Sequence, residues 1–347
     1  MDLESHRIHP EQSILGALEK INRLSKDLIL FVLEEDGTLK GTVTDGDIRR
    51  ALVAKSPLTK PIGSIMHKSF RYQTVASRDV KEFDRLRKQG IFYLPLVDEE
   101  MRLVRIVNLA KNRSDLPLRA LIMAGGEGRR LRPLTEKIPK PLVEVGGKPI
   151  VQYNIEHLVR FGINDITLSI RYLGALIKER FGTGEDLSCR LEYLEEKKAM
   201  GTISALGQLS SGGSKPVLVM NSDLLTNIDL EAFYLTFLEQ DAAMAVATVP
   251  YRVRVPYAVL ALDRGNVARF EEKPEYLYNC NSGIYLVNER AVERVPKDRP
   301  FHATDLMETL IAEGQRVISF PLRSYWLDIG QPEDLAKAEE DVQHIRF

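Results

Sequence analysis

A glycine-rich loop followed by several cations is the part of the sequence best suited to chemistry. Residues 121–150 read LIMAGGEGRRLRPLTEKIPKPLVEVGGKPI, an apolar run that enters glycines at positions 125, 126 and 128. Arginines follow at once, and Lys140 comes after a proline-containing stretch. Glycines allow a backbone to approach a ligand closely, and exposed N–H groups there can cradle an anion. This composition indicates a site for an anion; a plain turn with solvated arginines is the alternative.

Two common phosphate-binding loops do not match this segment. The dinucleotide fingerprint requires a glycine where Leu131 stands. The P-loop requires Ser or Thr after its Gly-Lys pair, but Gly147 and Lys148 are followed by Pro149. The segment is therefore neither of these two phosphate-binding loops.

Two aspartates stand where a metal ligand could be placed. Asp223 ends the apolar run VLVMNSD, and Asp328 precedes a glycine turn and a helix pattern in WLDIGQPEDL. Mg²⁺ prefers hard oxygen ligands and usually takes one or two protein carboxylates. Taken singly, each aspartate is more typical of a cap or a turn, so the residues alone leave both interpretations open.

Strand patterns alternate with helix patterns after residue 118, and this alternation predicts a mostly parallel sheet covered by helices. Ligands of such sheets bind beyond the carboxyl ends of the strands, where the glycine loop stands. The expected strands are residues 118–124, 165–170, 217–221 and 242–249, and the expected helices are residues 150–161, 202–209, 230–239 and 333–343.

A polar segment containing Pro117, residues 111–119, separates this region from an N-terminal part. That part holds two similar units, each with a strand, a turn and a second strand. Each unit is too short to bury a good core alone, so the two are expected to pack as a pair. The predicted domains are residues 1–112 and 118–347. The strands expected in the first are residues 28–33, 39–43, 93–97 and 103–107, with a helix at 80–89.

The bulk composition is that of an ordinary globular protein. Among 347 residues, 48 Lys and Arg balance 49 Asp and Glu, which argues against a dedicated nucleic-acid binder. Two cysteines leave no disulfide framework and no paired-cysteine metal motif. The first residues lack a signal-peptide profile, and no apolar run is long enough to span a bilayer. We therefore expect a cytoplasmic protein with no membrane partner.

The string GGEGRRLRPLTEKIPKPLVEVGGKPI resembles the signature of the sugar-1-phosphate nucleotidyltransferases, and the resemblance extends over residues 118–347. Members of that family join a nucleoside triphosphate to a sugar 1-phosphate and release pyrophosphate. The resemblance implies a mostly parallel, Rossmann-like α/β sheet and Mg²⁺-dependent chemistry. It further implies that Arg130, Lys140 and Asp223 are catalytic, and that Asp223 and Asp328 bind the metal.

Other residues are assigned to the two substrates by the same resemblance. EKP and N-x-G motifs recur within FEEKPEYLYNCNSGIYLV, and EEKKAMGTISAL is similar to the family segment that meets the base. Ser222, Ile203 and Ser204 depart from the family pattern. The nucleotide-binding residues implied are Ala124, Gly125, Gly126, Gly128, Glu196 and Gly201; the sugar-phosphate-binding residues implied are Glu272, Lys273, Asn281 and Gly283.

The base is predicted from Glu196, which falls where the family places its base-reading side chain. An ionised carboxylate only accepts hydrogen bonds, and guanine offers two adjacent donors on its Watson–Crick edge. Uracil and thymine offer one donor between two carbonyls, and adenine pairs a donor with an acceptor. We therefore expect GTP as the donor. The alternatives are a UTP- or dTTP-using enzyme, with Glu196 on a solvated face of its E-E-K-K run.

TVTDGDIRRAL, with a SIM element further on, resembles the cystathionine-β-synthase (CBS) paired module over residues 8–110. That resemblance implies an adenine-nucleotide site using Thr44 and Asp47; the alternative is that the same residues only cap a helix. A CBS pair fused to this transferase resembles the glucosamine-1-phosphate guanylyltransferases of legionaminic acid synthesis. Mannose- and heptose-phosphate guanylyltransferases share the catalytic motifs. We expect a homo-oligomer, and the competing hypothesis is a catalytically inactive nucleotide sensor.

Overall fold

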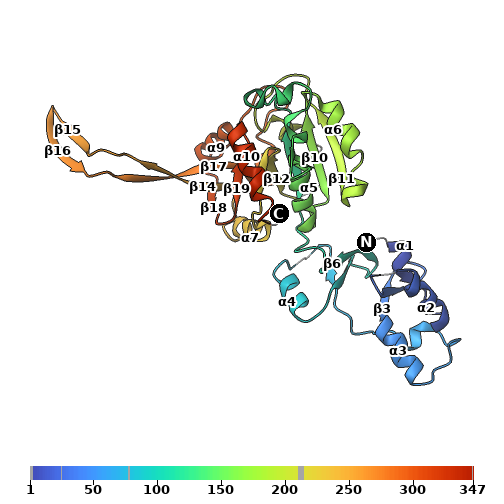
Figure 1. Ribbon diagram of the computed structural model, residues 1–347. Coiled ribbons are helices and arrows are strands. Elements are labelled where there is room, and N and C mark those ends of the chain that lie inside the picture. The colour runs from blue at the N-terminus through green and yellow to red at the C-terminus, as the bar shows by residue number, and fades with distance from the viewer. Residues whose placement is uncertain (1–2, 25, 77–78, 210–214, 346) are drawn as a thin grey trace. The chain divides into compact units, whose positions relative to one another are not determined.

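The chain divides into two compact units, Met1–Asp115 and Leu116–Phe347 (Figure 1). The structure is a computed structural model that describes residues 3–24, 26–76, 79–209, 215–345 and 347. The division falls inside the polar segment that separates the two domains expected from the sequence, and each unit is described below by itself.

A seven-stranded sheet forms the centre of the larger unit. Four neighbouring strands are parallel, β17 runs antiparallel to the strands on both its sides, and β18 is parallel to β14. The predicted α/β fold with a mostly parallel sheet is therefore confirmed. The order across the sheet is β11 (Arg190–Glu195), β10 (Asp165–Ile170), β7 (Arg119–Ala124), β12 (Val217–Asn221), β17 (Glu275–Val287), β14 (Met244–Arg254) and β18 (Val317–Pro321).

Helices and short two-stranded sheets complete this unit. Central strands such as β7 and β12 are buried on both faces, as expected of apolar runs in a parallel sheet. The helices are α5 (Ile150–Arg160), α6 (Gly174–Phe181), α7 (Leu230–Glu239), α8 (Glu289–Val292), α9 (Ala303–Ala312) and α10 (Pro332–Asp341). The small sheets pair β8 (Glu144–Val145) with β9 (Lys148–Pro149) and β13 (Leu224–Thr226) with β19 (Trp326–Asp328).

The helix predicted over residues 202–209 was wrong. Only a short 3-10 helix, Ser204–Gln208, forms there. The Ile203 N–H donates to the Phe301 carbonyl instead of to a preceding turn. A Cβ at Gly207 would lie 2.6 Å from the Val295 carbonyl oxygen, so the segment is packed tightly against neighbouring backbone. These tertiary contacts outweigh the helical pattern of the sequence.

An arm leaves the sheet where β14 and β17 continue past their neighbours as a two-stranded ribbon. Beyond this ribbon the chain forms a further hairpin of β15 (Val259–Asp263) and β16 (Asn266–Glu271). We call residues 250–279 the arm. Figure 1 shows the arm projecting from the body of the larger unit. The sequence predicted the first part of β14 but not its extension.

The smaller unit contains two copies of one plan, as predicted for a CBS pair. In each copy a short strand runs parallel to the first strand of a hairpin, and the hairpin register shifts at an equivalent place. The first copy comprises α1 (Leu3–His6), β1 (Arg7–Ile8), α2 (Ile14–Arg23), β2 (Ile29–Leu33), β3 (Leu39–Thr44) and α3 (Asp45–Val53); the second comprises β4 (Gln73–Thr74), α4 (Glu82–Lys88), β5 (Tyr93–Val97) and β6 (Leu103–Asn108).

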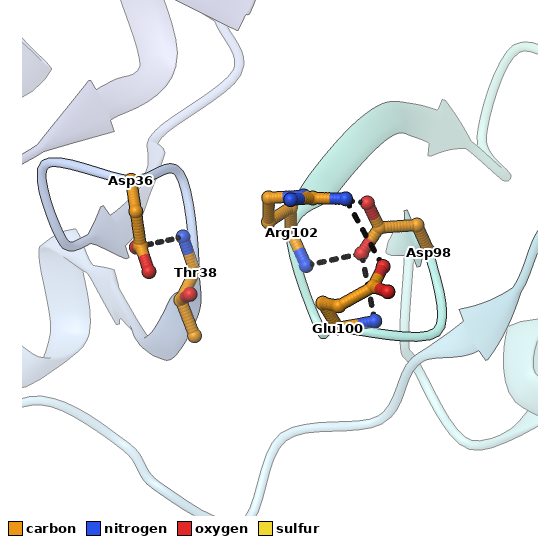
Figure 2. Close-up of polar contacts among 5 residues, drawn as sticks. All are labelled: Asp36, Thr38, Asp98, Glu100 and Arg102. Carbon is orange, nitrogen blue, oxygen red and sulfur yellow. Dashed lines mark hydrogen bonds and ion pairs between the residues drawn. The ribbon is translucent and has the colours of Figure 1, made fainter.

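The turns of the two hairpins join the copies, and Figure 2 shows the side chains that shape them. Thr38 and Arg102 form an isolated antiparallel bridge between the turns. Asp36 accepts from the Thr38 N–H at 2.9 Å, which holds the pKa of that carboxyl below its usual value. In the other turn Asp98 accepts from the backbone N–H groups of Glu100 and Arg102 and from the Arg102 guanidinium. Each carboxylate therefore fixes the turn that meets the other copy.

Candidate active site

Lys140 lies between two aspartates that are far from it in the sequence. Its ammonium donates to Asp223 in a short contact and stands 4.0 Å from Asp328 Oδ1. Asp223 stands two residues after the end of β12, and Asp328 ends β19, which pairs with β13 so that Leu224 faces Asp328. The sheet edge therefore brings together three residues that the sequence assigned to catalysis and metal binding.

Burial raises the pKa of Asp328 above its usual value, and the neighbouring Asp223 carboxylate raises it further. The charges of Lys140 and Arg130 oppose this shift only in part. Among the described residues Asp328 Oδ1 is buried and accepts no hydrogen bond. Two close carboxylates with one unsatisfied oxygen are a donor set that suits a hard divalent cation.

The two aspartates would not enclose a metal by themselves. Across the described ranges, no cluster of three or more His, Cys, Asp or Glu residues could hold a metal ion. A cation on Asp223 and Asp328 would therefore need further oxygens from elsewhere. Phosphate groups of a nucleotide are the usual complement of one or two carboxylates at a Mg²⁺ site.

Gly128 fixes the glycine loop against Lys140. Its φ of +61° is left-handed, and a Cβ there would lie 3.0 Å from both Lys140 Cβ and Thr135 Cγ2. The Thr135 hydroxyl donates to the Gly128 carbonyl at 2.8 Å. The loop can therefore pack beside Lys140 only because residue 128 has no side chain.

We expect Gly128→Ala to lower kcat by about tenfold or more, since a shift of the reacting groups by a fraction of an ångström has large effects. The matched control is Gly314→Ala. Gly314 has a φ of +69° with no atom within 4 Å of an added Cβ. Both variants carry the same backbone strain, and unfolding curves should show similar losses of stability. Equal kcat values in the two variants would show that Gly128 does not position Lys140.

A pocket of about 340 Å³ lies beside the loop. Four of the six residues predicted to bind the nucleotide line it: Gly125, Gly126, Glu196 and Gly201. Ala124 is buried at the end of β7 and is not part of the lining. The other lining residues are Met123, Arg171, Ala199, Met200, Thr202, Asn221 and His302.

Glu196 points into this pocket rather than onto a solvated face. The hydroxyl of Ser169, a fully buried residue, contacts Glu196 Oε1 at short range. The Glu196 N–H donates to the Ile170 carbonyl at 2.9 Å, which continues the pairing of β10 and β11. The preceding residue Glu195 is exposed and pairs with Lys178 instead. The E-E-K-K run is therefore split between solvent and pocket.

Arg130 packs close to Asp328, and the N-x-G motif packs against the wall of the pocket. The Arg130 guanidinium packs on Gly330, since Nη2 would be 3.1 Å from an added Cβ there. Gly283 has a φ of +77°, and a Cβ on it would lie 2.5 Å from the side chain of Asn221 in the pocket wall. Asn281 accepts from the Gly283 N–H at 2.9 Å and donates to the Tyr285 hydroxyl at 2.8 Å. Asn281 therefore shapes the turn at Gly283.

Glu272 and Lys273 are not brought to the pocket. Both are exposed and lie on the arm, between β16 and β17. The pocket lining, as far as the described residues go, contains no residue of the arm. This is the main difference between the arrangement expected from the sequence and the structure.

Sequence reasoning missed Arg171, which lines the pocket and lies 3.6 Å from Glu127 of the glycine loop. A signal for it was present, because Arg171 directly follows an apolar strand pattern, as Asp223 nearly does. The indole N–H of Trp326 donates to the Ser282 carbonyl at 3.0 Å, which ties β19 to the N-x-G turn.

The family description "Nucleotidyl transferase" matches residues 119–345 of this chain, which include every residue of the site described above. The chain belongs to the nucleotidyl transferase family. The description "CBS domain" matches residues 2–54. Together they confirm a nucleotidyl transferase domain preceded by CBS sequence.

Relatives of this nucleotidyl transferase include the mannose-1-phosphate guanylyltransferase catalytic subunit beta of Xenopus tropicalis, with 30% identity over 225 residues. The match covers 62% of this chain and 62% of that relative. Among solved structures, HddC from Yersinia pseudotuberculosis is 28% identical with a TM-score of 0.51, covering 65% of this chain and 99% of its own. The same protein complexed with GMP-PN is 27% identical, again with a TM-score of 0.51.

The CBS unit has a cavity of about 560 Å³ that includes Thr44, His67 and Arg71 in its lining. Thr44 also caps α3, with its hydroxyl accepting from the Asp47 N–H and the Asp47 carboxylate accepting from the Thr44 N–H. The second Asp47 oxygen pairs with Arg50. The structure thus forms the helix cap that was the alternative interpretation, and it leaves Thr44 beside a cavity. No helix within the described ranges is long and apolar enough to cross a membrane.

Proposed function

We propose that this chain transfers GMP from GTP to a sugar 1-phosphate and releases pyrophosphate. The observation that carries the proposal is the meeting of three features at one sheet edge: the glycine loop, a pocket containing a carboxylate, and Lys140 between two aspartates. Glucosamine 1-phosphate and mannose-type 1-phosphates are the proposed acceptors. The first rests on the resemblance of the fused CBS and transferase sequence, and the second agrees with the guanylyltransferase relatives.

The proposed reaction is a single in-line displacement. An oxygen of the sugar phosphate attacks the α-phosphorus of GTP, and the bond between that phosphorus and the β-phosphate oxygen breaks. The pyrophosphate leaves with the electron pair of that bond. In this proposal Lys140 and Arg130 neutralise negative charge that shifts toward the leaving group.

Asp223 and Asp328 would hold a Mg²⁺ ion in this proposal, because they offer hard oxygen donors beside the loop. The bound ion would supply charge neutralisation at the phosphates. Lys140 contributes a second role through its contact with Asp223. Its ammonium compensates the charge of the paired carboxylates, and the same group would contact the phosphates of a bound nucleotide.

The base is assigned to guanine through Glu196. A carboxylate held by Ser169 presents an oxygen in the pocket where it can accept from guanine N1–H and the 2-amino group. The structure of HddC with GMP-PN supports guanine, since GMP-PN is a guanine nucleotide. The same carboxylate would repel the carbonyls of uracil and thymine.

Pyrophosphate release tests the proposed function. The full chain would be assayed with Mg²⁺, five donors (GTP, UTP, CTP, ATP and dTTP) and a panel of sugar 1-phosphates. We expect turnover that requires both substrates and is greatest with GTP. A preference for UTP or dTTP would overturn the guanine assignment, and the lack of turnover on every pair would favour the nucleotide-sensor hypothesis.

Lys273→Met is expected to raise the KM for the sugar 1-phosphate more than the KM for GTP. This follows from the proposed contact of Lys273 with the acceptor phosphate only. Steady-state kinetics with each substrate varied in turn is the measurement. Lys297→Met, which removes an exposed cation outside the arm, is the control. Equal changes in both KM values would contradict this role.

The CBS unit is proposed to bind one adenine nucleotide per chain in the cavity beside Thr44. Titration calorimetry of the full chain with AMP, ADP and ATP should give binding heat, and Thr44→Val should weaken it. Losing one hydrogen bond of a half-buried hydroxyl costs on the order of 1 kcal/mol, or about fivefold in Kd. If adenine nucleotides give neither binding heat nor a shift in melting temperature, Thr44 and Asp47 would serve only as a helix cap.

A further inference from the structure

The outer part of the arm is a ribbon with two chemically different faces. Residues paired across an antiparallel hairpin share a face, as do residues two apart along a strand. Leu260 pairs with Phe270, and Leu262 pairs with Val267, so these four form one apolar face. The reverse face carries the pairs Val259–Glu271 and Ala261–Arg269, and Arg269 lies 3.8 Å from Glu271.

The apolar face is uncovered in the single chain. Leu260, Leu262, Val267 and Phe270 are 52%, 65%, 57% and 66% exposed. The inner ribbon adds the exposed cross-strand pair of Tyr251 and Tyr278, while on its reverse face Glu275 pairs with both Arg252 and Arg254.

A two-stranded ribbon has little stability of its own in water. Contiguous exposed apolar side chains on a folded protein mark interaction surfaces. The reverse faces carry ion pairs within the arm, whereas the apolar face has no such contacts to make, so the apolar face is the side that gains most from a partner. It contains no charged residue among its four members, and a partner face of the same kind would meet no electrostatic repulsion.

The arm also carries Glu272 and Lys273, at the junction between its inner and outer parts. In the proposed function these two residues bind the acceptor sugar phosphate. Their place on a projecting arm leaves the site of the same chain without them (Figure 1). A second chain that received the arm would gain both residues.

We propose that the arm is an exchange element between two copies of this chain. Its apolar face packs against a second copy, and the association delivers Glu272 and Lys273 to the partner's active site. The delivery to the site rests on the proposed function, whereas the association does not. A second copy of this chain is the partner that fits, because a two-fold dimer uses the same surface on both chains. Such a dimer would cover both apolar faces and complete both active sites.

The association is tested by the mass of the full chain in solution, measured by light scattering and sedimentation velocity. We expect the wild type to be a dimer or a larger even oligomer. Leu262→Glu should shift it toward the monomer by at least about tenfold in Kd, because a charge is buried in the contact. Ala261→Glu is the matched control, since its carboxylate lies on the reverse face opposite Arg269.

A monomeric wild type would overturn the proposal, as would a dimer that Leu262→Glu and Ala261→Glu affect equally. Circular dichroism of both variants establishes that the fold is retained. If Leu262→Glu fails to fold, the milder Leu262→Ser serves in its place.

Delivery in trans is tested by mixing two impaired chains at a sugar 1-phosphate concentration far below the KM of Lys273→Met, where each chain alone has little activity. Lys140→Met removes the site but keeps the arm, and Lys273→Met keeps the site but removes the arm lysine. Random co-assembly into dimers makes half of the dimers mixed. In a mixed dimer one of the two sites has both Lys140 and a delivered Lys273. About a quarter of the wild-type activity should therefore return. Activity no greater than that of the separate variants would overturn the delivery.

The control outcomes separate this inference from the proposed function. A wild type with no turnover on any substrate pair would remove the proposed function, while the association experiment would still decide whether the arm joins two chains. An active wild-type monomer would keep the proposed function and remove the arm exchange.

Discussion

Asp328→Asn should remove most Mg²⁺-dependent turnover while making the metal-free protein more stable near neutral pH. The loss of turnover follows because an amide keeps the shape of the carboxylate but binds Mg²⁺ poorly. A metal ion supplies several kcal/mol of charge stabilisation, so the loss should be about a hundredfold or more. Asp223→Asn should cause a similar loss of turnover.

The gain in stability follows from the raised pKa of Asp328, which burial and the Asp223 carboxylate cause. A carboxyl group with a folded-state pKa above its unfolded value favours folding when protonated. That contribution is fully present below the unfolded pKa and is lost as the pH rises through the folded pKa. At neutral pH the ionised Asp328 therefore destabilises the metal-free fold, and an amide removes the penalty.

Melting curves of the metal-free and Mg²⁺-loaded proteins check both parts of this expectation. The wild type should gain stability with Mg²⁺, and this gain should weaken as acid protonates Asp328. Asp328→Asn should melt higher without metal and respond little to Mg²⁺. Asp298→Asn, which removes an exposed carboxylate, is the control. A full response of Asp328→Asn to Mg²⁺ would place the metal elsewhere.

Glu196→Gln is expected to lower kcat/KM for GTP by about tenfold or more while relaxing the discrimination against UTP. The amide replaces one acceptor oxygen by a donor, so one hydrogen bond to a charged group is lost, at a cost of roughly 1.5–3 kcal/mol. An amide also removes the repulsion between the carboxylate and the carbonyls of uracil. Donor competition assays with GTP and UTP measure both effects.

Glu195→Gln is the matched control for this substitution, because Glu195 is the exposed neighbour that pairs with Lys178 outside the pocket. It should leave the GTP preference unchanged. Wild-type base preference in the Glu196 variant would leave the guanine assignment without its structural support.

Regular elements were predictable where burial alone sets the pattern. The strands at residues 165–170 and 217–221 and the helix at residues 230–239 have the bounds expected from apolar runs ended by turn residues. The helix expected over residues 202–209 was wrong, since contacts with Phe301 and Val295 are not visible in a local pattern. The arm was not predicted, because its strands are exposed and lack the long apolar runs that mark buried strands.

The site was predictable to the extent that its residues follow strands of the central sheet. Asp223 and Glu196 come after β12 and β11, where these parallel strands of the central sheet end. Asp328 is brought beside Asp223 by the antiparallel pairing of β19 with β13, and Lys140 contacts both aspartates from a short 3-10 helix. Ser169 escaped notice because a serine in an apolar strand gives no sign of the side chain that it holds. The positions of Glu272 and Lys273 relative to the site depend on the direction of the arm, and no local sequence pattern predicts that direction.

The product formed from GTP and a sugar 1-phosphate labelled with ¹⁸O in its phosphate tests the central claim most directly. Mass spectrometry should find a guanosine-diphosphate sugar that retains every labelled oxygen, and a pyrophosphate that contains none. This result is required if a sugar phosphate oxygen attacks the α-phosphorus of GTP. Labelled oxygen in the pyrophosphate, or a product without guanine, would contradict the proposed guanylyl transfer.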